Sequence, residues 1–261
     1  MIRCRIAGLL ACATLALLLA APVAAAGAAA HRAAATAFTD AEIADGFFKV
    51  AFGAEYRLAG RSDRIRKFVV PVRVAITGVA SPRRRATLAR VVAAIGARIR
   101  HLDIALAAPG ETANLTVTLV RDRNMRRAIE ARFGKEHART IRRRLAPQCL
   151  SGLRKNAQFA IERAEVILAT DSDDFTFRDC AYEEMLQALG PINDTATVPW
   201  TMFNDDVRTG AFGVYDQLLL NILYDPRIQP GMSAGEVEAL LPQVLPEVRA
   251  FVAGTGRHGP D

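Results

Sequence analysis

The sequence predicts an α+β domain built on a mixed β-sheet, with an α/β arrangement as the alternative class. Segments rich in β-branched residues, bounded by charged residues and glycine, alternate with segments whose apolar residues recur at helical spacing. The chain has 261 residues, of which 51% are hydrophobic and 23% are charged, so it is long enough for one domain with a sizeable core. Strands and helices that alternate in this order pack as layers around a sheet.

The first half of the chain predicts helix, strand, helix and strand. Residues 38–56 place apolar side chains on one helix face behind a threonine or aspartate cap. Residues 67–78 form a β-branched segment in which Pro71 indicates an edge strand or the start of a strand. Residues 81–103 begin with Ser and Pro, as helices do, and continue with amphipathic spacing, and residues 113–120 predict the second strand.

The second half predicts a basic helical segment, one or two strands and three further helices. Residues 121–146 carry ten basic and three acidic residues, with Gly134 as a possible break. Residues 158–171 predict the strands. The remaining helices are expected from about Phe177 to Gly190, over 215–224, and over 233–254 with Pro242 and Pro246 inside the last.

The start of the chain predicts export. Two arginines precede an apolar run, and three alanines at 24–26 offer a cleavage site, so we expect residues 1–26 to be a secretory signal peptide. An uncleaved membrane anchor over 6–26 is the alternative, and a lipoprotein acylated at Cys12 fits less well because the apolar run continues past it. The expected mature protein then has a flexible terminus (27–37), one domain (38–254) and a tail (255–261).

Charge favours partners found in the bacterial envelope. Loss of the signal removes Arg3 and Arg5 and no acid, so the formal charge falls from +7 to +5 and the mature protein stays basic. A basic periplasmic or secreted protein meets anionic headgroups, cell-wall polymers and acidic proteins more often than nucleic acid, which we do not expect as a partner. Residues 121–146 are the candidate surface for an anionic membrane, and a solvated arginine-rich surface is the simpler interpretation.

The cysteine count predicts one disulfide. Cys4 and Cys12 leave with the signal peptide, so Cys149 and Cys180 remain as an even pair in an oxidising compartment. The alternative is a pair of buried free thiols.

Residues 180–194, CAYEEMLQALGPIND, have the spacing of a metallopeptidase helix without its histidines. An HExxH helix needs histidines at i and i+4 to bind zinc from one face, with the glutamate as general base; its extended form adds a glycine and a third ligand. Here the three ligand positions hold Glu183, Gln187 and Asn193, and Glu184 takes the position of the general base.

The motifs that follow support a resemblance. Residues 200–203, Trp-Thr-Met-Phe, are placed like the turn in which a methionine, here Met202, forms the floor of such a site. From about Phe38 to Met232 the chain resembles a family of exported bacterial proteins of unknown function (DUF2927 type), and more distantly the metzincin peptidases. The resemblance implies a zincin-like mixed sheet packed on an active-site-type helix, with additional C-terminal helices, and it implies little about activity. The residues that carry it include Cys180, Glu183, Glu184, Gln187, Gly190, Asn193, Asp194, Asn204 and the segments 223–227 and 230–232.

The altered ligand set disfavours zinc, because zinc sites use imidazole, thiolate and at most one carboxylate. A hard cation such as calcium accepts carboxylate and amide oxygens, so Glu183, Gln187, Asn193 and Asp194 could hold one weakly. The simpler interpretation is that Glu183 and Gln187 bond to nearby backbone or to Asn193 without any metal.

Two functions follow from this pattern. The first is a non-catalytic binding or envelope protein, with a peptide, a cell-wall component or an envelope protein as partner. The second is a hydrolase of peptidase type, cation-dependent or metal-free, with Glu184 as general base; the sequence offers it no recognisable nucleophile or oxyanion hole. The four histidines, His31, His101, His137 and His258, are expected to be solvated. Asn204, Asp205 and Asp206 are expected to cap or turn the chain, with lining of the cleft as the alternative. Asp225 and Arg227 are expected in a turn, with contact to a ligand as the alternative.

Overall fold

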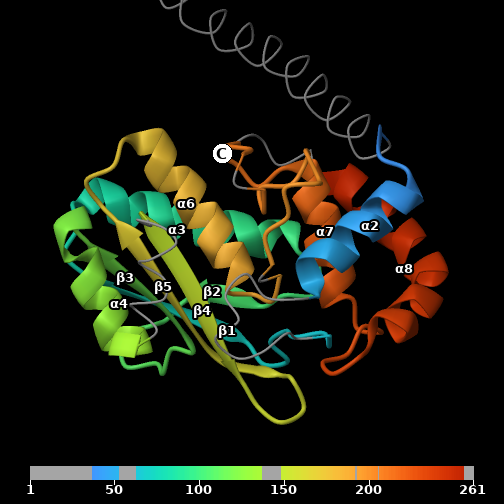
Figure 1. Cartoon of the computed structure of the whole chain (residues 1–261), viewed down its shortest axis with the longest axis horizontal. Coiled ribbons are helices and arrows are strands. Elements are labelled where there is room, and N and C mark those ends of the chain that lie inside the picture. Colours follow the sequence, from blue (N-terminus) through green and yellow to red (C-terminus); the bar gives the residue numbers. More distant parts are fainter. Residues whose placement is uncertain (1–36, 53–62, 137–147, 192, 205, 256–261) are drawn as a thin grey trace, which may run out of the picture.

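The computed structural model describes residues 37–52, 63–136, 148–191, 193–204 and 206–255. Within these residues a five-stranded mixed sheet lies beside a group of helices (Figure 1). The strand order is β2-β1-β3-β5-β4, and β4 alone runs antiparallel to its neighbour. The strands are β1 (Val72–Gly78), β2 (Ile104–Leu106), β3 (Leu115–Val120), β4 (Cys149–Lys155) and β5 (Ile161–Ala169).

Helices cover both faces of the sheet. On one face, β3 and β5 contribute alternating buried residues to the main core, against which α3 and α6 pack. On the other face, Ile167 of β5 packs with Met125 and Ile129 of α4 in a smaller cluster. The helices are α2 (Asp40–Ala51), α3 (Pro82–Arg98), the short 3-10 helix η1 (Asp122–Asn124), α4 (Met125–Phe133), α6 (Asp174–Gln187), α7 (Val214–Tyr224) and α8 (Ala234–Thr255).

Helix α7 forms the centre of the C-terminal helical layer. Every residue from Tyr215 to Tyr224 is buried, and α2 and α8 pack against it (Figure 1). The buried Lys67 amine donates to the carbonyl oxygens of Leu223 at 3.0 Å and Asp225 at 2.9 Å, so a cation closes the negative end of α7. Burial lowers the pKa of Lys67 to about 8.

The α+β class is confirmed, and the predicted helices and strands occur in the predicted order. Strand β1 begins directly after Pro71 and pairs with strands on both sides, so this proline marks the start of a strand and not an edge. Helix α6 begins at Asp174, earlier than expected, because the Asp173 side chain accepts a hydrogen bond from the Thr176 amide at 2.9 Å and caps it.

Two strands were not predicted. The short β2 pairs with β1, and β4 pairs with β5, which is one continuous strand. The sequence of β4, CLSGLRK, lacks a regular apolar alternation, and its pairing with β5 decides its conformation. Gly134 ends α4 at a φ of 85°, as its position suggested.

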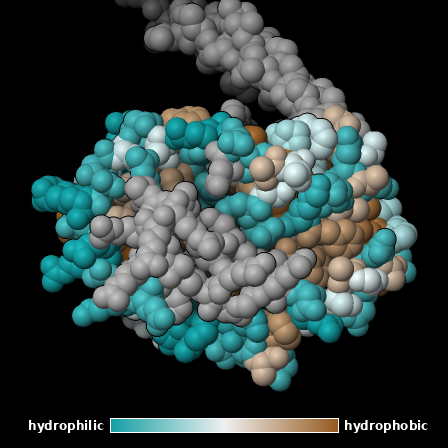
Figure 2. Space-filling view, in the orientation of Figure 1, coloured by the Kyte–Doolittle hydropathy of each residue, from teal (hydrophilic) through white to brown (hydrophobic). Residues whose placement is uncertain are grey.

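Several predicted segments lie outside the described residues. These are the signal peptide (1–26), all but the last residue of 27–37, the tail beyond 255, and residues 137–146 of the basic segment. Where the structure does describe the chain, none of its helices has the length and apolar character needed to cross a membrane. On the face shown in Figure 2, hydrophilic residues cover the left of the view, where Figure 1 places α4.

Candidate functional site

Helix α6, which carries the peptidase-like motif, is buried on most of its surface. It packs on β4, β5 and α3, and its buried apolar residues include Phe177, Ala181 and Met185. Its polar residues Glu184 and Gln187 are buried as well, at 7% and 5% exposed. A helix at a protein surface has one apolar face, whereas α6 is enclosed on two sides, so its polar side chains need partners inside the protein.

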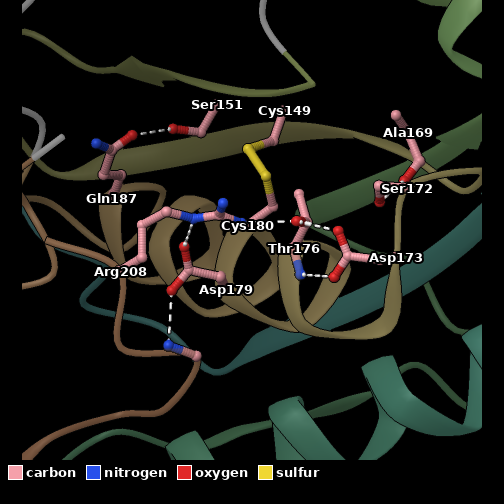
Figure 3. Close-up of a disulfide and its surroundings, with 11 residues drawn as sticks. Cys149, Ser151, Ala169, Ser172, Asp173, Thr176, Asp179, Cys180, Gln187 and Arg208 are labelled. Atoms are coloured by element: carbon pink, nitrogen blue, oxygen red, sulfur yellow. Dashed lines mark hydrogen bonds and ion pairs between the residues drawn. A yellow bond between two sulfur atoms is a disulfide. The ribbon is translucent and has the colours of Figure 1, made fainter. Parts of the chain in front are cut away.

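The predicted disulfide is confirmed. Cys149 on β4 and Cys180 on α6 are bonded across a sequence separation of 31 residues (Figure 3). It fixes the edge strand of the sheet to the middle of the helix. On the chain-entropy model, closure of such a loop stabilises the fold by roughly 3–4 kcal/mol.

Both ends of the Gln187 amide are engaged. The Ser151 hydroxyl of β4 donates to Gln187 Oε1 at 3.0 Å (Figure 3), and Gln187 Nε2 donates to Asp194 Oδ1 at 2.7 Å. Gln187 therefore links the edge strand to the segment that follows α6. A side chain held in this way acts as a structural bridge.

Asn193 has different partners. Its Nδ2 donates to the carbonyl oxygen of Lys49 at 2.7 Å, and its backbone amide donates to that of Val50 at 3.3 Å. Asn193 thus ties the segment after α6 to the last turn of α2. The structure does not give Gln187 and Asn193 a common partner, as a shared ligand set would require.

The two glutamates of the motif differ in burial. Glu184 lies in the interior and Glu183 is half-buried. Within the described ranges, no group of three or more His, Cys, Asp or Glu residues is arranged to hold a metal ion. The amide oxygen of Gln187, which is the atom that would bind a cation, already accepts a hydrogen bond from the Ser151 hydroxyl, so a cation there would have to displace or share that bond.

Met202 is fixed from α7. Its backbone amide donates to Asp216 Oδ2 at 3.2 Å, and the Thr201 hydroxyl donates to Asp216 Oδ1 at 2.6 Å. Asp216 is 1% exposed, and burial raises its pKa to about 7 although both hydrogen bonds lower it. Sequence analysis did not single out Asp216; the signal that could have found it is an acid inside the apolar run YDQLLLNILY.

A second polar anchor on α6 was also missed. Asp179 Oδ1 accepts a hydrogen bond from the Gly210 amide at 2.7 Å, and Oδ2 accepts one from Arg208 Nε at 3.4 Å. Arg208 in turn donates to Thr176 Oγ1 at 2.6 Å (Figure 3). The loop around Arg208 is thereby held against the N-terminal half of α6.

The turn roles expected for two polar segments are confirmed. Asn204 Oδ1 accepts from the Asp206 amide at 3.0 Å, which is an Asx-type turn. Arg227 donates to both carboxylate oxygens of Asp225, at 2.8 and 2.7 Å. Burial alone would raise the pKa of Asp225, and the hydrogen bonds from Arg227 outweigh it, so that pKa is lowered.

The outer edge of β4 has no strand partner among the described residues. The Ala169 amide donates to the Gln148 carbonyl at 2.8 Å. Because backbone groups alternate in direction along an antiparallel strand, Gln148 and every second residue after it direct their N–H and C=O groups toward β5. The N–H and C=O groups of Cys149, Ser151 and Leu153 therefore point away from the sheet. The side chains of Cys149 and Ser151 point toward α6, as their disulfide and hydrogen bond require.

These features define a mixed α+β protein whose edge strand is cross-linked to the helix beside it. Residues 40–243 match a family described as a protein of unknown function, DUF2927. The chain belongs to this family. No curated protein and no solved structure matches it.

Proposed function

We propose that the protein is an exported, non-catalytic binding protein that holds an extended peptide segment of an envelope partner along the outer edge of β4. The observation that carries the proposal is the open edge at Cys149, Ser151 and Leu153, fixed against α6 by a disulfide. An edge strand with outward backbone groups can accept a further strand, with main-chain hydrogen bonds supplying affinity. A cell-wall component is the other partner class compatible with export.

The proposed scaffold is zincin-like with its metal ligands replaced. Support comes from α6, which comes after the last strand in the sequence and carries Glu183, Glu184 and Gln187 at the spacing of the peptidase motif. Further support comes from Met202, which is buried in a turn held by the next helix. On this view the helix and the turn of an ancestral peptidase are retained as the support for the binding edge.

Gln187 is the main argument for a non-catalytic site. The position that would hold a metal-binding histidine instead bridges Ser151 and Asp194. Such a bridge holds the edge strand in place, which a peptide-binding surface needs. We therefore propose no metal cofactor, with calcium as the hard-cation alternative.

The test uses two variants of one edge residue. Leu153→Pro removes an outward amide without removing a bond to β5, whereas Leu153→Ala removes the same side-chain packing and keeps the amide. We expect the wild-type protein, disulfide intact, to bind members of an immobilised library of peptides of about ten residues. Leu153→Pro should weaken that binding by about tenfold or more, and Leu153→Ala by less than about threefold. Equal losses in both variants would contradict edge binding.

A hydrolase is the alternative, motivated by the buried carboxylate of Glu184. Burial is the environment that prepares a carboxylate for acid or base catalysis. Cleavage of the same peptides by the wild-type protein, abolished by Glu184→Gln, would replace the binding proposal. One zinc ion per chain in the purified protein, measured by elemental analysis, would contradict a metal-free scaffold.

A further inference from the structure

A cavity of about 220 Å³ lies between α3 and α6 and shares no residue with the proposed peptide edge. The two helices pack against each other (Figure 1). Each contributes residues spaced three or four apart, so one face of each helix forms a wall. The lining residues are Arg83, Arg84, Thr87, Arg90 and Val91 from α3, and Asp174, Arg178 and Tyr182 from α6.

The cavity carries an excess of positive charge. Four of its lining residues are arginines and one is an acid. The acid, Asp174, is already paired: its Oδ1 lies 3.0 Å from Arg84 Nη1 and its Oδ2 contacts Arg83. Arg90 donates only to the Thr87 hydroxyl, at 3.1 Å, and within the described chain the Arg178 guanidinium has no ion-pair partner. Two guanidinium groups are therefore available for an anion.

The start of α3 adds to this charge. Its first turn holds Arg83, Arg84 and Arg85 and no acidic residue. The N-terminal end of a helix is the positive end of its dipole, where acidic residues are favoured and basic residues are not. Asp174 offsets part of this charge in the free protein, and a bound anion would offset more of it.

One wall of the cavity is rigid before any ligand binds. Arg84 Nε donates to the Thr170 carbonyl at 3.2 Å, and a second nitrogen donates to the carbonyl of Ser172. The guanidinium lies 4.5 Å from the centre of the Phe177 ring, and the side chain is 12% exposed. This fixed guanidinium contributes positive charge to the cavity, and it loses no conformational entropy when an anion binds to Arg90 and Arg178.

We propose that this cavity binds a phosphate group, either free inorganic phosphate or the headgroup of an anionic lipid. Arginine presents a planar fork of donors that matches phosphate oxygens, and several arginines suit a group with more than one negative charge. The cavity is smaller than the pockets that hold drug-sized ligands, so it suits a small anion.

The first measurement is calorimetric titration of the whole mature protein with inorganic phosphate at low ionic strength. The wild-type protein should bind phosphate saturably at one site. The double variant Arg90→Gln, Arg178→Gln should weaken binding by about tenfold or more, since it removes the two available guanidinium groups. The matched control Arg154→Gln, Arg163→Gln removes two exposed arginines of β4 and β5 and should change affinity by less than about twofold.

The second measurement separates the two sources of phosphate. Sedimentation with phosphatidylglycerol vesicles, compared with phosphatidylcholine vesicles, should show binding that free phosphate competes away if a lipid headgroup is the ligand. Phosphate binding without vesicle binding would assign the site to the free anion. The proposal is overturned if neither probe binds saturably, or if the control variant weakens binding as much as the cavity variant. Neither outcome depends on peptide binding, which is tested separately with the Leu153 variants.

Discussion

Helices α6 and α7 both bury polar side chains, but they differ in what surrounds those side chains. On α7, Asn221 accepts from the Arg100 amide at 2.9 Å and donates to the Arg98 carbonyl at 2.8 Å, so it holds the end of α3. Asp216 holds the turn at Met202 in the same way. On α6, Gln187 is bonded just as fully, yet it lies beside the open edge of β4.

The difference shows that a buried polar residue is not in itself a sign of a site. Buried polar groups are normally satisfied by the fold, and Asp216 and Asn221 of α7 are both bonded to protein atoms. What distinguishes α6 is its neighbourhood: one end lies near a strand edge that has no strand partner among the described residues, and the other end lines an arginine-rich cavity. Three experiments sharpen the contrast.

The largest expected effect concerns Asp216 on α7. Its pKa is about 7 in the folded protein and 3.8 when exposed, so between these values the unfolded chain releases a proton that the folded chain keeps. The contribution of Asp216 to the free energy of unfolding is therefore highest below pH 4, falls as pH rises to about 7, and is constant above that. The total change is on the order of 4 kcal/mol. Urea unfolding from pH 4 to 8 should show this slope in the wild-type protein and its loss in Asp216→Asn.

Thr201→Val provides the control for that experiment. The Thr201 hydroxyl bonds to Asp216 and lowers its pKa, so its removal should raise the pKa further and extend the falling limb to higher pH. If wild type and Asp216→Asn have the same pH dependence, Asp216 is not the titrating group and α7 is less tightly closed than the structure shows.

The next effect concerns the link between β4 and α6. We expect Cys149→Ala, Cys180→Ala to lose about 3 kcal/mol of unfolding free energy, mainly because the unfolded chain gains freedom. Chemical denaturation measures this, and wild-type protein with reductant should behave like the double variant. A loss below about 1 kcal/mol would show that packing alone holds the edge strand to α6.

Sequence patterns were sufficient for most helices and for the disulfide. A Thr39 cap and a Ser81–Pro82 start are local signals, and both helices begin where these signals lie. The cysteine pairing was predicted from the number of cysteines left after the expected signal peptide and from the oxidising compartment expected for an exported protein. Neither inference needed knowledge of which segments meet in space.

Strand β4 and the anchors on α6 and α7 could not be predicted, because they depend on long-range contacts. The segment CLSGLRK becomes a strand through β5 and a disulfide, not through its own propensity. Asp179 gave no local sign that it bonds the Gly210 amide, 31 residues away. The ligand positions of the peptidase motif were assigned from spacing alone, and spacing did not reveal that Gln187 and Asn193 bond to different segments.

The smallest effects come from a matched pair of amide replacements, Asn221→Leu on α7 and Gln187→Met on α6. Asn221→Leu removes three hydrogen bonds, to the Arg98 carbonyl, the Arg100 amide and the buried Gln217 carbonyl, and should cost about 2–3 kcal/mol. Gln187→Met should cost about 1 kcal/mol, because Ser151 and Asp194 are only partly buried and can bond to water instead.

Measurement of peptide binding shows whether Gln187 positions β4 for a partner or only stabilises the fold. If Gln187 only positions β4 for a partner, Gln187→Met should weaken peptide binding by a few fold while unfolding free energy changes little, and Asn221→Leu should do the reverse. Ser151→Ala removes the same bond from the strand side and should give the Gln187→Met result. If all three variants lose stability and binding in proportion, the polar residues of α6 and α7 have the same structural role, and Gln187 does not position the edge of β4 for a partner.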